Sequence, residues 1–69
     1  MKFNLNQKIN HHTFGEGSIT EIIERTWEKD QTAESLIWVT FDTPVINALG
    51  KTTTKILFSE SSLLRNIEN

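Results

Sequence analysis

Hydrophobic and polar positions alternate along several short stretches of this chain, a pattern typical of half-buried β-strands. The clearest stretch covers residues 36–41, where Ile37, Val39 and Phe41 share one face of the predicted strand. Nine threonines and eight isoleucines support β-structure, because β-branched residues favour strands. We expect the other strands at residues 8–12, 18–27, 53–58 and 64–67.

The second predicted strand does not keep a single alternation. Ile19 and Ile23 have the same parity along the chain, whereas Ile22 has the other. Two explanations are open. Either both faces of this strand are partly covered, or a β-bulge between Ile19 and Ile22 moves the apolar residues to the other face.

A glycine-rich turn joins the first two predicted strands. Glycine tolerates a positive φ, which suits a tight turn at Phe14-Gly15-Glu16-Gly17. This Gly-x-Gly has no third glycine and no helix after it, so a phosphate-binding loop is not indicated. We therefore assign a structural role to the turn and to the histidine before it, that is to His11, Phe14, Gly15 and Gly17.

The remaining connections are less regular. Residues 28–34 are polar and predict a hairpin loop, and residues 59–62 predict a polar stop with a single 3₁₀ turn. Residues 42–53 predict a longer connection, since Thr43-Pro44 marks a turn. Its apolar residues suggest either that it folds back over the domain or that it forms one helical turn closed by Gly50.

Together these segments predict an all-β fold, a small SH3-like or Tudor-like barrel of about five short antiparallel strands. A chain of 69 residues allows one domain, residues 1–69, and we place its core at about residues 7–67. A domain of this size rarely gains more than about 3–5 kcal/mol from its core. A deep catalytic cleft would remove apolar contacts that it needs.

Composition excludes several classes of protein. Seven basic and nine acidic residues give a net charge of −2, which argues against a nucleic-acid module held by charge alone. The absence of cysteine excludes disulfide scaffolds and thiol catalysis. No apolar run is long enough for a membrane helix and no signal peptide is recognisable, so we expect a soluble cytoplasmic protein.

The sequence offers little that could perform catalysis. His11 and His12 are adjacent on a predicted strand and point to opposite faces, so they cannot easily share a metal ion. No nucleophile motif occurs. We expect no catalytic residues, no metal and no cofactor.

Two tryptophans and a few basic residues are the candidates for binding a partner. Trp38 faces away from the predicted core, where it is either an exposed recognition residue or covered by residues 42–50 or by Phe3 and Leu5. Acidic residues such as Glu21 and Glu24 dilute the basic ones. The predicted partner-binding residues are Trp38, Trp27, Arg25, Lys51 and Lys55.

The order of these residues resembles a known family. Its pattern here is Ile9, His11, Phe14-Gly15-Glu16-Gly17, Ile19, Ile22, Val39-x-Phe41, Lys55-x-Leu57 and Leu64-x-x-Ile67. This resembles the C-terminal Tudor-like domain of UvrD/PcrA-type bacterial DNA helicases and, more loosely, other small SH3-like modules that bind RNA polymerase, including the CarD-type domain. The chain departs from that family at Asn6-Gln7, where a glycine is usual, and in its longer connection over residues 42–53.

The resemblance implies a barrel that binds bacterial RNA polymerase or another protein of transcription or DNA repair. We therefore expect a non-catalytic protein-interaction module that uses a sheet edge or face. One alternative is a small nucleic-acid-binding barrel that stacks bases on the same aromatic residues. Another is a standalone inhibitor or adaptor, such as a phage-encoded one, that occupies a host protein. The oligomeric state is left open.

Overall fold

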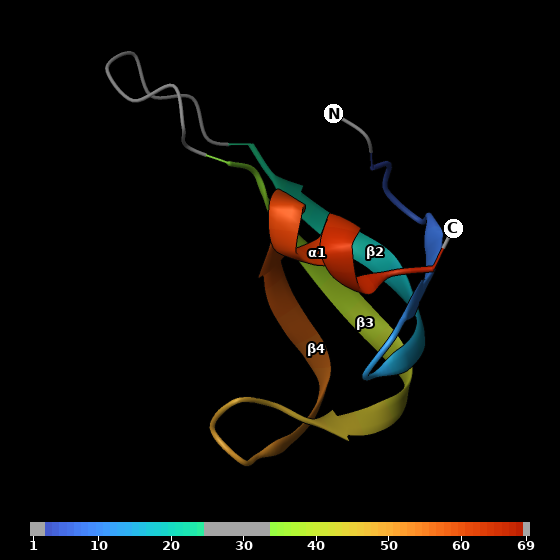
Figure 1. Cartoon of the computed structure of the whole chain (residues 1–69), viewed down its shortest axis with the longest axis vertical. Coiled ribbons are helices and arrows are strands. Elements are labelled where there is room, and N and C mark those ends of the chain that lie inside the picture. Colours follow the sequence, from blue (N-terminus) through green and yellow to red (C-terminus); the bar gives the residue numbers. More distant parts are fainter. Residues whose placement is uncertain (1–2, 25–33, 69) are drawn as a thin grey trace.

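A single antiparallel sheet forms most of the structure, a computed structural model that describes residues 3–24 and 34–68 (Figure 1). Its strands follow one another in the order β1-β2-β3-β4. In the described residues the elements are β1 (Lys8–His11), β2 (Gly15–Ile23), β3 (Leu36–Ile46), β4 (Thr52–Ser59) and α1 (Glu60–Asn66). The strands predicted at 8–12, 36–41 and 53–58 are confirmed with shifted ends, and the one at 18–27 is confirmed within the described residues. Residues 25–27 of that prediction and residues 28–33 of the predicted hairpin loop lie outside the described residues.

The end of the described chain returns to the first strand. His11 forms a β-bridge with Ile67. On either side, the His12 N–H donates to the carbonyl of Asn66 at 2.7 Å and the Glu68 N–H donates to that of Asn10 at 2.9 Å. Figure 1 shows this segment beside β1. The curved four-stranded sheet, with this bridge back to its first strand, confirms the predicted all-β, barrel-like fold class.

The irregularity of β2 is a β-bulge. Its register against β3 shifts between Ile19 and Glu21, so Thr20 is the extra residue. Ile19 is fully buried and Ile22 packs against the same core, while Ile23 is exposed. The predicted β-bulge between Ile19 and Ile22 is therefore the correct explanation of their different parity.

The core lies between the concave face of the sheet and α1. Phe3 belongs to this core, with only 4% of its surface exposed, although it precedes the expected core range of 7–67. The buried apolar residues are Phe3, Ile9, Ile19, Ile37, Val39, Phe41, Phe58, Leu63 and Ile67.

The predicted 3₁₀ turn and fifth strand at residues 59–67 are wrong, because this segment is a helix up to Asn66. The Ser59 hydroxyl caps it by accepting from the Ser62 N–H at 3.3 Å. The Glu34 carboxylate accepts from the Ser61 N–H at 3.0 Å and from its hydroxyl at 2.9 Å. Leu63 is fully buried beneath the sheet's concave face, so the helix is held by its cap and by its packing.

The predicted long connection at residues 42–53 is also wrong, because β3 continues through it to Ile46. The register against β4 shifts between Thr40 and Val45, and Pro44, which lacks an N–H, falls within this irregular stretch. Of the predicted connection at residues 42–53, residues 47–51 alone form a loop between β3 and β4. There the Asn47 side chain accepts from the N–H groups of Leu49 and Lys51 at 2.9 and 3.0 Å.

Candidate protein-interaction face

The convex face of β2, β3 and β4 carries a cluster of apolar side chains. Register places Trp38 opposite Leu57 and Leu36 opposite Ile23. Ile23 and Leu57 are 37% and 39% exposed, which is high for large aliphatic residues in a sheet. We call these four residues, Ile23, Leu36, Trp38 and Leu57, the outer patch.

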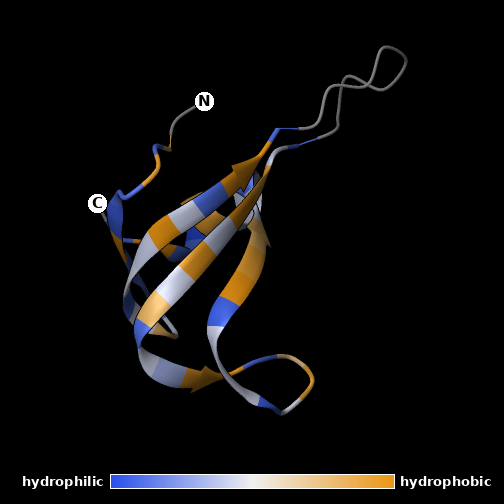
Figure 2. Ribbon diagram, turned by 180° about the vertical axis from the view of Figure 1, so that it is seen from behind, coloured by the Kyte–Doolittle hydropathy of each residue, from blue (hydrophilic) through white to orange (hydrophobic). Residues whose placement is uncertain are grey.

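Within the described residues no element covers the outer patch. The helix lies on the opposite side of the sheet, and Figure 2 shows the convex face unobstructed. Phe3 is buried in the core, and Val45 packs against that core. Ile46 and Leu49 are 65% and 81% exposed, so the apolar residues of the β3–β4 hairpin do not fold over Trp38.

Polar groups surround Trp38 in a defined arrangement. The Lys55 ammonium lies 5.4 Å from the centre of the Trp38 ring, a cation–π contact. Glu21 is opposite Trp38 on the other neighbouring strand. Next to them, the hydroxyls of Thr20 and Thr40 are hydrogen bonded at 3.0 Å. Trp38 is thus half-buried on the convex face and held by its neighbours.

The predicted partner-binding residues do not all gather here. Trp38 and Lys55 are in direct contact, whereas Lys51 lies at the base of the β3–β4 hairpin. Trp27 and Arg25 lie outside the described residues. Sequence reasoning missed Ile23, Leu36 and Leu57. Leu36 has the same parity as Trp38, and Leu57 the same as Lys55, so strand alternation alone could have placed them on the face of Trp38. Ile23 lies on that face only because of the bulge in β2.

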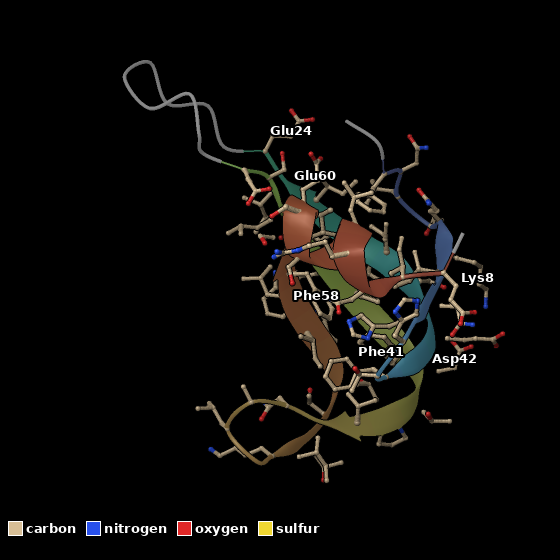
Figure 3. All side chains as sticks on the ribbon, in the orientation of Figure 1. Lys8, Glu24, Phe41, Asp42, Phe58 and Glu60 are labelled. Atoms are coloured by element: carbon tan, nitrogen blue, oxygen red, sulfur yellow. The ribbon has the colours of Figure 1, made fainter. Side chains whose placement is uncertain are left out.

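His11 and Phe14, two of the four residues assigned to the turn, lie in an aromatic cluster with Phe41 and Phe58. His11 is 5% exposed, and its ring centre lies 4.8 Å from that of Phe14 and 5.1 Å from that of Phe58. The ring of Phe41 meets it edge-on at 6.1 Å, and Figure 3 shows Phe41 and Phe58 on the concave side of the sheet. These rings make His11 part of the core.

His11 also organises the turn through one atom. Its Nδ1 accepts from the N–H groups of Thr13 at 3.0 Å and Phe14 at 3.3 Å. An accepting Nδ1 requires the neutral ring. Burial lowers the pKa of His11, and the nearby His12 lowers it further. His11 is therefore placed to hold the turn, and its ring does not reach the outer patch.

Gly15 and Gly17 are needed for different reasons. Gly15 has a φ of +86°, and a Cβ there would meet nothing within 4 Å. At Gly17, by contrast, a Cβ would lie 2.8 Å from the Thr40 carbonyl oxygen and 2.9 Å from the Phe41 ring. Gly15 is needed because the turn requires a positive φ. Gly17 is needed because β2 and β3 lie too close together at this position for a Cβ.

The described residues give little support for a small-molecule site. They contain no group of three or more His, Cys, Asp or Glu side chains that could hold a metal ion. Two open depressions, of about 290 and 540 Å³, are lined by other residues, and neither includes Trp38 or Lys55. In the part of the chain that is described, no helix has the length and apolar character to cross a membrane.

Comparisons with protein-family models, curated proteins and solved structures gave no match.

Proposed function

We propose that this chain is a non-catalytic protein-interaction module that binds its partner through the outer patch. The observation that carries the proposal is Trp38, a large aromatic residue on an uncovered sheet face with a lysine over its ring. Tryptophan is enriched among the residues that dominate binding energy at protein interfaces. Because Trp38 and its neighbours stand on strands, ordering them on binding costs little entropy.

Recognition by the face is better supported than recognition by a sheet edge. Residues 66–68 cover β1. On β4, the last strand of the sheet, the Thr53 hydroxyl bonds to both the N–H and the carbonyl of Lys55 at 3.2 Å. These two backbone groups are therefore already engaged by a side chain and are less available to an added strand.

The first partner to test is bacterial RNA polymerase. This choice rests on the sequence resemblance to the Tudor-like domain of UvrD/PcrA-type helicases and to other polymerase-binding modules. An SH3-like barrel alone does not specify a partner, because such folds host many functions. The outer patch supplies an apolar surface, and Lys55 beside it supplies a cation.

Binding of purified core RNA polymerase to the immobilised chain tests the proposal. We expect Trp38→Ala to weaken the affinity about 30-fold, since a central tryptophan contributes about 2 kcal/mol or more. Leu49→Ala is the matched control, because Leu49 is a large exposed residue on the hairpin, outside the outer patch. Circular dichroism checks that each variant is folded. Equal affinities of the Trp38→Ala variant and the unmodified chain would contradict the proposal.

Nucleic acid is the second function that this arrangement suggests, because Trp38 could stack on a base while Lys55 contacts a phosphate. Glu21 argues against it, since it places a carboxylate opposite Trp38 in the sheet. Salt separates the two functions. A phosphate-dominated complex weakens steeply as salt rises and is lost after nuclease treatment, whereas an apolar protein interface survives both.

A further inference from the structure

The charges beside the outer patch lie on opposite sides of Trp38. Glu21 is on β2, directly opposite Trp38, and Lys55 is on β4, opposite Thr40. Among the described residues the one ion pair is between Lys8 and Asp42, at 3.9 Å (Figure 3). The carboxylate of Glu21 therefore has no cation in that part of the chain, and the ammonium of Lys55 has only the Trp38 ring.

This arrangement is self-complementary under a two-fold rotation. If a second copy is turned about an axis parallel to β3, its β4 lies over β2 of the first copy. Glu21 then faces Leu57 of the second copy. Lys55 of the second copy is two residues further along that strand, about 7 Å away and within reach of a lysine side chain. Symmetry forms the same contact twice.

The other face-to-face orientation is unfavourable. An axis perpendicular to the strands places β2 over β2 and β4 over β4. Glu21 would then approach the glutamate of the second copy, and Lys55 would approach its lysine. Like charges in contact oppose association. Charge therefore favours one of these two aligned arrangements of the outer patches over the other.

We propose that a second copy of this chain docks on the outer patch, with the two β3 strands parallel and Glu21 of each copy paired with Lys55 of the other. The inference rests on the same face as the proposed function. Self-association and binding of the partner are therefore mutually exclusive, and the free chain protects its apolar patch until the partner displaces the second copy. The result is a homodimer whose interface consists of the two sheet faces packed against each other.

Sedimentation velocity over about 1 µM to 1 mM tests this directly, because a dimer forms by mass action. We expect the weight-average mass to rise with concentration from 8.0 kDa toward twice that value. Lys55→Glu and Glu21→Lys should each weaken the association about tenfold or more, since each turns two attractive contacts into repulsive ones. Urea unfolding of each variant checks that the fold is intact.

Two further samples make the test specific. The double variant Glu21→Lys/Lys55→Glu should regain the unmodified dimer affinity, and an equimolar mixture of the two single variants should form a heterodimer. In the unfavourable orientation the unmodified chain and the double variant would both repel themselves, and only the mixture would associate. A mass of 8.0 kDa at every concentration overturns the inference. It leaves the proposed function standing, because the latter is tested by binding of RNA polymerase to the Trp38→Ala variant.

Discussion

His11 contributes to stability in two ways that can be separated by substitution. Its ring packs among Phe14, Phe41 and Phe58, and its Nδ1 accepts two backbone hydrogen bonds. His11→Phe keeps an aromatic ring but removes the acceptor. His11→Asn keeps an acceptor near the position of Nδ1 but removes the ring. The two variants thus measure different parts of the same interaction.

The structure gives a magnitude for each part. The two N–H groups are partly buried, so losing their acceptor should cost about 1–2 kcal/mol, the lower end of the range for buried unsatisfied donors. Losing the ring leaves a cavity among three phenylalanines, which should cost about 2–4 kcal/mol. We therefore expect both variants to be less stable than the unmodified chain, with His11→Asn the less stable of the two.

Urea unfolding followed by tryptophan fluorescence measures these differences, first at about pH 7.5, where the histidine is neutral. If His11→Phe were as stable as the unmodified chain, the two hydrogen bonds would contribute nothing and the reasoning would be refuted. A stable His11→Asn variant would refute the contribution of the ring in the same way.

The same series predicts a pH dependence. Burial first, and the charge of His12 second, lower the pKa of His11 in the folded state from the ordinary value of 6.5. Between these two pKa values the unfolded chain binds more protons than the folded chain. The stability is therefore complete above pH 6.5 and falls as the pH drops from 6.5 toward the lowered pKa.

His11→Phe removes this titration and leaves the other groups in place. We expect its deficit in unfolding free energy to be largest at about pH 7.5 and to shrink by about pH 5, because only the unmodified chain loses stability through His11. A deficit that stays constant across this range would contradict the assignment of Nδ1 as the acceptor.

Three other predictions concern the two glycines and the packing of α1. Gly17→Ala should cost about 1–3 kcal/mol because its Cβ would meet the Thr40 carbonyl at 2.8 Å, and Gly17→Asn should cost more. Gly15→Ala should cost about 1–2 kcal/mol through its φ of +86°, and here Asn should be milder than Ala because it tolerates positive φ. Leu63→Ala should cost about 2–5 kcal/mol, and a loss below about 1 kcal/mol would show that α1 does not pack on the sheet. Thermal or urea unfolding measures all of these values.

The strands could be predicted from the sequence because their signal is local. Alternation over residues 36–41 identifies β3, and the broken parity of Ile19 and Ile22 already allows the bulge. Four of the five predicted strands exist, and the fold class follows from their number and their turns.

The helix could not be predicted as easily, because part of what holds it is distant in sequence. The Glu34 carboxylate bonds to Ser61 across 27 positions, and Leu63 is buried by the sheet. A local signal was nevertheless present. Ser59 is a favourable N-cap, and Leu63 and Ile67 are four residues apart, as on one face of a helix.

The outer patch was only half predictable for a similar reason. Trp38 and Lys55 follow from strand parity. Ile23 joins them only because the bulge at Thr20 reverses the faces of β2, and its pairing with Leu36 depends on a register that the sequence does not state. In the same way, Thr43-Pro44 predicts a turn, whereas the chain uses that proline within a bent strand.

The return of residues 66–68 to β1 has a consequence for how the chain folds and opens. It joins segments from opposite ends of the described chain, so the entropy of closing that loop must be overcome before the His12–Asn66 and Glu68–Asn10 hydrogen bonds can form. The β2–β3 and β3–β4 pairings are more local and can form earlier. We therefore expect the contact of residues 66–68 with β1 to form late in folding and to open before the sheet that carries Trp38. The amide protons of His12 and Glu68 should then exchange with solvent before those of β3.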